Sequence, residues 1–305
     1  MWIHAIFPKD NSEPAWKLSW RCSKADYRNK QSFKKGIHNM YYLGIDIGSL
    51  SCDAVLLDQN NQILAEAVVP TGARNREAIR NVREAVIRKA GISDDQVQAT
   101  VSTGYGRDRV DGRLTAVTEI SCHARGIKAA LNGDARILID IGGQDSKAIR
   151  LDGEGRVADF AMNDKCAAGT GRFLEAMARA LQVDIWELSE LDCGAEENLT
   201  LSSMCTVFAE SEVVSLIADG IEVKEIVAGM NRAIASRISA LAKRVCRDTT
   251  GLSIAMSGGV AHNRGVVRAL RTAFGQDITV PDHPDTIGAL GAALMARERS
   301  KNKSE

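Results

Sequence analysis

The sequence is poor in aromatic residues and has no excess charge of either sign. Phe, Trp and Tyr make up 5% of its 305 residues, and 39 basic residues balance 39 acidic ones. Balanced charge argues against broad electrostatic attraction to nucleic acid or to an anionic membrane surface. No apolar run reaches the roughly 18 residues expected of a membrane-spanning helix. We therefore expect neither a nucleic-acid nor a membrane partner.

Several common signatures are also missing. The cysteines number seven, which is odd, and no signal peptide is recognisable, so a disulfide framework is not expected and a reducing cytoplasm is the default location. No CxxC pair occurs, which argues against a zinc knuckle or ribbon. The absence of GxxxxGK[ST] argues against a P-loop NTPase, and no helix opens on GxGxxG as in a dinucleotide fold.

The first part of the chain differs from the rest. Residues 1–39 hold three of the four tryptophans and eight basic residues against three acidic ones, without clear periodicity. We expect a disordered or non-native leader there; a short docking arm is the alternative. At the other end, residues 298–305 are expected to form a flexible tail.

What is present is an internal duplication. YYLGIDIGSLSCDAVLLDQNNQILAEAVV, from Tyr41, and RILIDIGGQDSKAIRLDGEGRVADFAM, from Arg136, each predict three strands joined by tight turns. Asp46 and Asp140 end the first strand of each copy and lie 94 residues apart. A single D-x-G turn is usually an ordinary strand end, but two in register predict a repeat. The halves would be 40–135 and 136–297.

Each copy delivers an aspartate to a turn where small residues let backbone N–H groups approach an anion. We expect Asp46 and Asp140 to organise Mg²⁺ and the attacking water, since Mg²⁺ prefers one or two carboxylates with phosphate and water oxygens. Gln144 is expected to orient that water, and Asp145 either does the same or caps the hairpin. The expected phosphate-binding residues of the two turns are Gly48, Ser49, Leu50, Ser51, Gly142 and Gly143.

Two more glycine elements follow. IAMSGGV predicts a strand that runs into Gly258 and Gly259 and then a helix, a suitable place for the adenosine side of a nucleotide. Asn263 is a nucleotide candidate, with a surface helix residue as the alternative. DTIGALGAALMA predicts a helix in which Gly288 and Gly291 permit close packing.

GIDIGS, DIGGQD and SGGV resemble the two phosphate motifs and the adenosine motif of the acetate kinase, Hsp70, actin and sugar-kinase superfamily. The resemblance implies an α/β fold of two duplicated ribonuclease H-like domains with a nucleotide cleft between them. In that arrangement the C-terminal helix packs back on the first half.

The stretch MNDKCAAGTGRF leaves three chemistries open for Cys166: a nucleophile, a residue beside a phosphate, or a metal ligand. It is expected just before a helix N-terminus, as is Cys205 in SSMCTVFAESEVVSLIADG, and such a position favours a thiolate. No base is tied to either cysteine, and simple burial is the alternative. An iron–sulfur cluster is typically bound by four thiolates, and two chains with two cysteines each would supply them.

NDKCAAGTGRF and CTVFAESEV resemble the activator ATPases of 2-hydroxyacyl-CoA dehydratases, within the BadF/BadG/BcrA/BcrD family, over about Met40 to about Arg297. The resemblance implies a homodimer that binds ATP/ADP and Mg²⁺ and shares one [4Fe–4S] cluster, held by Cys166 and Cys205 of each chain. Reduced ferredoxin or flavodoxin would charge the cluster, and ATP hydrolysis would drive an electron into a dehydratase-type partner. The stretch that would also contact nucleotide comprises Ala168, Gly169, Thr170 and Gly171.

Three other functions stay open: an ATPase subunit of a benzoyl-CoA reductase-like enzyme, a small-molecule kinase of the same fold, and an ATP-switched scaffold without a cluster. Lys165 is expected to stabilise the negative charge of a cluster or to attract an acidic electron donor. The alternative is an ordinary solvated lysine. The cysteines without a matched partner are expected to be structural: Cys52, Cys122, Cys193 and Cys246.

Overall fold

The computed structural model describes residues 40–196, 199–201 and 205–301. The expected leader, residues 1–39, lies outside the described residues, and so do residues 302–305 of the expected tail. Residues 298–301 belong to the last helix, α8, which runs from Ile287 to Lys301.

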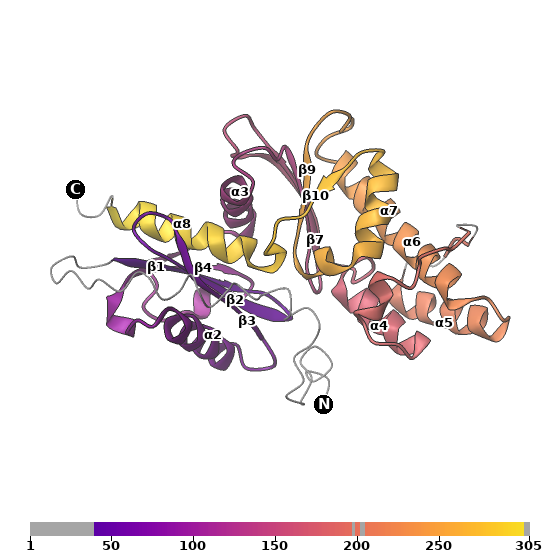
Figure 1. Cartoon of the computed structure of the whole chain (residues 1–305), viewed down its shortest axis with the longest axis horizontal. Coiled ribbons are helices and arrows are strands. Elements are labelled where there is room, and N and C mark those ends of the chain that lie inside the picture. Colours follow the sequence, from indigo (N-terminus) through magenta and orange to yellow (C-terminus); the bar gives the residue numbers. More distant parts are fainter. Residues whose placement is uncertain (1–39, 197–198, 202–204, 302–305) are drawn as a thin grey trace, which may run out of the picture. The chain divides into compact units, whose positions relative to one another are not determined.

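Two five-stranded mixed sheets form the framework, and their strands follow the same order (Figure 1). The first is β3-β2-β1-β4-β5 and the second is β8-β7-β6-β9-β10. In each, an antiparallel three-strand unit is extended by parallel strands. The strands of the first sheet are β1 (Tyr41–Ile47), β2 (Ser51–Leu57), β3 (Ile63–Pro70), β4 (Val97–Gly104) and β5 (Thr115–Ala116). The strands of the second sheet are β6 (Ile137–Ile141), β7 (Ser146–Leu151), β8 (Val157–Asn163), β9 (Ile254–Ser257) and β10 (Ile278–Thr279).

This arrangement confirms the predicted duplicated α/β fold. The expected three-strand units are β1–β3 and β6–β8, and the register repeats within them. Asp46 lies opposite Asp53 in the β1–β2 pair, and Asp140 lies opposite Lys147 in the β6–β7 pair. At the 94-residue spacing, Lys147 therefore corresponds to Asp53, just as Asp140 corresponds to Asp46.

Helices cover both faces of the first sheet (Figure 1). Helix α2 (Asn75–Ala90) packs on β2 and β3 through Ala78, Ile79, Val82 and Val86, which recur at helical spacing. It ends at Gly91, whose positive φ of 68° suits a residue without a Cβ. Helix α8 packs on β1, β2 and β4 and so returns the chain from the second sheet to the first.

Helix α8 also packs closely on α3 (Glu119–Ala130), because small residues line the contact. A Cβ added at Gly291 would collide with the carbonyl oxygen of Cys122, and one at Gly126 would collide with that of Ile287. Gly288 is equally constrained, by the Asp46 carboxylate. The predicted close packing at Gly288 and Gly291 is confirmed.

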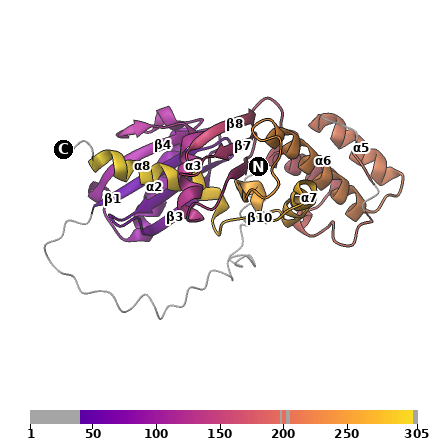
Figure 2. The ribbon, with the colours of Figure 1, turned by 90° about the horizontal axis from the view of Figure 1, so that it is seen from above.

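Helices α4, α5, α6 and α7 contribute to the largest apolar core beside the second sheet. Figure 2 shows α5, α6 and α7 together on one side of that sheet. Helix α6 contacts β7 and β8, α7 packs on α6, and α4 and α5 pack on each other. Their bounds are α4 (Gly171–Leu181), α5 (Thr206–Ala218), α6 (Val223–Lys243) and α7 (Arg264–Phe274). Among the described residues, we find no helix with the length and apolar character to cross a membrane.

Candidate functional site

The first glycine turn joins β1 to β2 and is fixed by hydrogen bonds. The Gly48 amide donates to the Ser51 carbonyl oxygen (2.9 Å). Thr71 donates twice to the same turn, from its amide to the Leu50 carbonyl and from its hydroxyl to the Gly48 carbonyl, both at 2.9 Å. Residues 48–51 are partly buried, so the turn is ordered yet accessible.

The second glycine turn joins β6 to β7 and touches the first. The Gly142 amide donates to the Asp145 carbonyl oxygen (3.0 Å), which matches the bond across the first turn. A Cβ at Gly143 would collide with the Leu50 side chain. The two predicted phosphate turns therefore meet across the halves, while Gln144 is exposed beside them.

The same turn holds the N-terminus of α4. The amides of Gly171 and Arg172 donate to the carbonyl oxygens of Gly142 (3.0 Å) and Gly143 (2.9 Å). These bonds satisfy two of the helix's first amides, which have no partner within the helix. The segment that follows Cys166 is thereby connected directly to a predicted phosphate turn.

Asp140 is a buried carboxylate that accepts hydrogen bonds at both of its oxygens. It is 2% exposed, and its Oδ1 accepts from the Ser257 hydroxyl (2.7 Å) and from Nε2 of His123 (3.2 Å). Its Oδ2 accepts from Nζ of Lys147 (3.1 Å). Burial raises the pKa of Asp140, but the charges of His123 and Lys147 outweigh burial and hold it well below its usual range.

Asp46 lies in a different environment. It is buried, and a Cβ at either Gly104 or Gly288 would collide with its carboxylate, so glycines make room for it. Burial raises its pKa, with His123 acting in the opposite sense. Across the strand pair, Asp53 accepts from the Ser51 hydroxyl at Oδ2 (3.1 Å), while its buried Oδ1 has no hydrogen-bond partner among the described residues.

Two cations at this site were not predicted as site residues. His123 on α3 bonds the Glu119 carbonyl through Nδ1 (2.9 Å) and Asp140 through Nε2. Burial lowers the pKa of His123, but Asp140 and then Asp46 raise it to about 9, so the imidazole is charged at neutral pH.

Lys147 on β7 is 3% exposed and lies 2.8 Å from Asp145 and 3.7 Å from Glu119, in addition to Asp140. Burial lowers the pKa of Lys147, but these three carboxylates raise it above its usual range. A sequence signal for Lys147 did exist: it stands in the strand of the second hairpin, seven residues after Asp140, where the antiparallel register pairs the two. The carboxylate of Asp145 pairs with Lys147, while its backbone carbonyl accepts the Gly142 amide.

The third glycine element lies beside Asp140. Gly258 follows β9 with a φ of 85°, donates its amide to the Pro284 carbonyl (2.9 Å), and would place a Cβ 3.1 Å from Oδ1 of Asp140. Gly259 comes next. Asn263 is buried rather than on the surface, so that alternative is wrong: its Oδ1 caps α7 by accepting the Val266 amide (3.1 Å).

The two matched cysteines are exposed and separate from this carboxylate cluster. Cys205 is the N-cap of α5, as predicted. Cys166 is not immediately before a helix: it lies in a turn four residues ahead of Thr170, the N-cap of α4. Ala168, Gly169 and Thr170 are buried within that turn, and both cysteines interact electrostatically with Arg237 of α6.

Exposed apolar side chains lie on α5, which follows Cys205, and on β8, which ends three residues before Cys166. On α5, Val207 and Phe208 are 65% and 67% exposed, and Val214 and Ile217 are also exposed; Phe160 on β8 is 52% exposed. The apolar side chains of α5 therefore do not all pack within the chain. Large exposed apolar groups that lie close together are typical of a contact surface.

The remaining predicted residues have simpler surroundings. Lys165 is exposed and pairs with Asp164 (3.0 Å). Cys52 and Cys122 are buried, and burial raises the pKa of the Cys122 thiol to about 12. Cys193 is exposed, so it is not a buried structural cysteine. The part of the chain that the structure describes contains no group of three or more His, Cys, Asp or Glu side chains placed to hold a metal ion.

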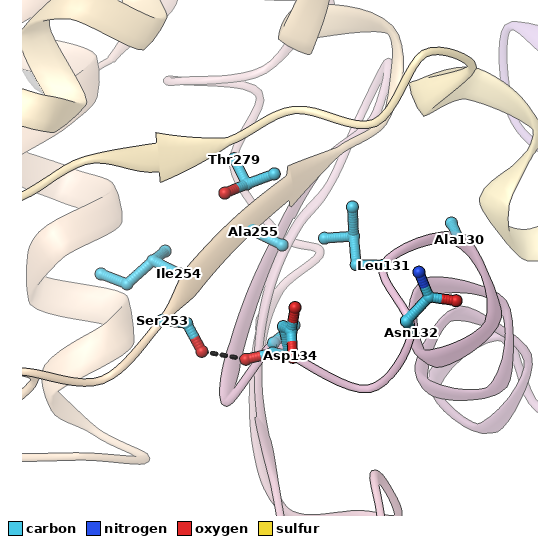
Figure 3. A pocket seen from close by; sticks show the side chains of 9 residues that line it. Ala130, Leu131, Asn132, Asp134, Ser253, Ile254, Ala255 and Thr279 are labelled. Atoms are coloured by element: carbon cyan, nitrogen blue, oxygen red, sulfur yellow. Dashed lines mark hydrogen bonds between the residues drawn. The ribbon is translucent and has the colours of Figure 1, made fainter.

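Two surface cavities lie away from the predicted site residues. Figure 3 shows one of about 240 Å³, between the end of α3 and the starts of β6 and β9, with Leu131 and Thr279 in its wall. The other, of about 500 Å³, surrounds the N-terminus of α2 and is lined by four arginines. Neither is lined by any predicted nucleotide or cysteine residue.

Comparison with known proteins identifies close relatives. The model of the BadF/BadG/BcrA/BcrD ATPase family matches residues 43–296. The activator of lactoyl-CoA dehydratase from Anaerotignum propionicum is 47% identical over 87% of this chain and 100% of its own length. A benzoyl-CoA reductase subunit of Thauera aromatica is 32% identical over 84% of this chain and 93% of its own.

A solved structure agrees with the fold. The activator of the 2-hydroxyisocaproyl-CoA dehydratase from Clostridium difficile, with bound ADPNP, is 41% identical. It superposes with a TM-score of 0.80 and covers 87% of this chain and 97% of that one.

Proposed function

The chain belongs to the BadF/BadG/BcrA/BcrD ATPase family, and on that premise we propose that it hydrolyses ATP to deliver a low-potential electron to a 2-hydroxyacyl-CoA dehydratase-type enzyme. Its identity to a dehydratase activator, 47%, exceeds its identity to a benzoyl-CoA reductase subunit, 32%, which favours the activator over the reductase subunit. The observation that carries the proposal is the connection from the second glycine turn through α4 to the Cys166 segment.

The nucleotide would lie where the two glycine turns meet. The amides of Gly48 and Gly142 donate within their own turns, so we assign phosphate binding to the next residues, Ser49 and Gly143. Leu50, in contact with Gly143, would then close the cradle from the opposite half. We place adenosine beside Gly258, on the other side of Asp140.

The two aspartates would have different roles. Asp46 is the less engaged of the two, buried but held between glycines rather than between cations, and we assign Mg²⁺ to it, through bound water. The Oδ1 atom of Asp140 already accepts two bonds, from Ser257 and His123, whereas Oδ2 accepts one and keeps a second lone pair. We therefore assign the attacking water to Oδ2 of Asp140, with Gln144 as its second contact.

Cys166 and Cys205 fit an iron–sulfur cluster as donors. Both cysteines are exposed, and both interact electrostatically with the same cation, Arg237. One chain supplies two thiolates, so a [4Fe–4S] cluster requires a homodimer, one cluster per pair of chains. The cluster would supply one-electron transfer at low potential.

We expect the same region to contact other protein chains. The exposed Val207 and Phe208 beside Cys205 would be covered by the second chain of the homodimer, which removes apolar surface from water. Ferredoxin or flavodoxin would be the electron donor and the dehydratase the acceptor. Cysteines left free in a chain of this kind fit a reducing cytoplasm.

ATP would act by selecting one of two arrangements of the halves. Because the Gly142–Gly143 turn holds α4, a movement of that turn on phosphate would move the Cys166 segment as well. A ligand shifts such an equilibrium only by its different affinity for the two states. We propose that ATP and ADP differ in this way.

The test compares single cysteine variants purified without oxygen. Cys166→Ala and Cys205→Ala should each lose iron and partner activation while binding ATP with nearly wild-type affinity. Cys193→Ala is the matched control, because Cys193 is also exposed but lies outside the pair. Full iron content in either ligand variant contradicts the assignment, as does equal iron loss in the control. A colourless wild-type monomer that phosphorylates a sugar would instead support a kinase.

A further inference from the structure

Arg237 of α6 lies against the segment that carries Cys166. Its Cδ is 3.9 Å from the position that a Cβ on Gly169 would occupy, within the turn between Cys166 and α4. Its guanidinium carbon is 6.0 Å from the ring centroid of Phe173, in the first turn of α4. The residue is partly buried, and Nη1 of its guanidinium group is among the buried side-chain atoms.

Arg237 interacts electrostatically with both cysteines, in addition to its packing against the segment that follows Cys166. Burial lowers the pKa of Arg237, and negative charge on Cys166 and on Cys205 raises it. These thiols belong to segments that are 39 residues apart in the sequence, yet the same guanidinium interacts with both. An arginine keeps its proton throughout the physiological range, so the site contains a permanent positive charge.

We propose that Arg237 is the fixed counter-charge of the Cys166–Cys205 pair, a positioning residue that sets the reduction potential of the cluster these thiolates would hold. The inference rests on the proposed function, because it requires that the pair binds the cluster. It extends that function to a third residue, from a helix that carries neither cysteine.

The physical reason is the change of charge on reduction. A cluster bound by four thiolates is anionic and gains one further negative charge when it is reduced. A nearby cation stabilises the reduced form more than the oxidised form and therefore raises the reduction potential. Partial burial strengthens the effect, because charges interact more strongly away from water.

The experiment uses three variants of the full-length protein, purified without oxygen. Arg237→Gln removes the charge, Arg237→Lys keeps it, and Arg244→Gln removes a charge from the exposed C-terminal end of the same helix. Iron content, nucleotide affinity and the midpoint potential of the cluster are measured for each, the last by titration with electron paramagnetic resonance detection.

The Gln variant at position 237 should have a more negative midpoint. We expect the ratio of reduced to oxidised cluster at a fixed potential to fall at least tenfold, which is about 59 mV for a one-electron couple. The Lys variant should retain most of the wild-type midpoint, and Arg244→Gln all of it. Iron loss in Arg237→Gln, with nucleotide affinity intact and iron retained in Arg237→Lys, also supports the counter-charge.

Wild-type iron content and midpoint in Arg237→Gln would overturn the inference and leave the proposed function standing. A wild-type protein that binds no iron would instead refute the proposed function itself. If Arg237→Gln does not fold, Arg237→Lys decides. A midpoint potential within about 59 mV of the wild type, which is a tenfold change in the ratio of reduced to oxidised cluster, supports the proposal. Loss of iron from a Lys variant that still binds nucleotide overturns it, because the charge would then not suffice.

Discussion

Lys147 provides the sharpest test of the buried charge network. The residue is 3% exposed, and its ammonium group lies 2.8 Å from Asp145, 3.1 Å from Asp140 and 3.7 Å from Glu119. Lys147→Met removes the charge but keeps most of the apolar volume. The change leaves three buried or half-buried carboxylates without the ammonium group, of which Asp140 still has His123 as a partner.

The size of the effect follows from what is left unpaired. Removing one partner of a buried ion pair costs about 3–5 kcal/mol, because the remaining charge has neither water nor a partner. For a chain of this length, that loss lowers the melting temperature by roughly 10 °C. The deficit should shrink as the pH falls toward 4, because protonated carboxyls no longer need the ammonium group.

The assay is urea unfolding of Lys147→Met at pH 7.5 and at pH 4.5. Lys224→Met is the control, since Lys224 pairs with one carboxylate, Glu222, at 3.0 Å on the surface, and should unfold near the wild-type midpoint. Lys147→Met/Asp145→Asn should recover part of the lost stability by removing one stranded carboxylate. A Lys147→Met protein within about 1 kcal/mol of the wild type at pH 7.5 would refute the reasoning, because breaking a buried pair costs more than that.

Two other predictions concern close packing and a second buried carboxylate. Gly291→Ala should lower the free energy of unfolding by about 1–3 kcal/mol, because its Cβ would collide with the Cys122 carbonyl oxygen. Gly153→Ala, with nothing within 4 Å of its Cβ, should change little in the same urea assay. Burial and then Asp46 raise the pKa of Asp53 well above 3.8, so its stability contribution is present below that value and is lost as pH rises through the raised pKa. Asp53→Asn should therefore be more stable than the wild type at pH 8, by about 1–3 kcal/mol, and show no gain at pH 3.5; equal stability at pH 8 would contradict this.

The features that the sequence predicted well are those encoded over short distances. The strands and turns of both hairpins follow from apolar runs that end in Asp46 and Asp140. Gly288 and Gly291 indicated close helix packing, because small residues on one side of a helix let a neighbouring backbone approach it closely. The 94-residue spacing then related the two halves without any knowledge of their contacts.

Residues that depend on long-range pairing were harder to predict. His123 comes from a helix outside both hairpins, and nothing local relates it to Asp140. Lys147 is different, because it lies seven residues after Asp140 in a predicted hairpin, and the register of that hairpin, once considered, pairs the two. The start of α4 follows from the periodicity after Gly171, but the conformation of the segment between Cys166 and that helix does not.

The apolar side of α5 shows a further limit of sequence patterns. Helical periodicity indicates which side chains share a face, but not whether that face packs within the chain or on another protein. Val207 and Phe208 belong to such a face and are exposed in the single chain. A homodimer is the proposal that accounts for their exposure.

The central claim is that two chains of this ATPase share one cluster through Cys166 and Cys205. Its most direct test measures native mass and iron content together on the wild-type protein, purified without oxygen. The account predicts a brown dimer with about four irons, the content of one [4Fe–4S] cluster, which loses iron when it dissociates into monomers. An iron-free protein that hydrolyses ATP and activates its partner would contradict the account.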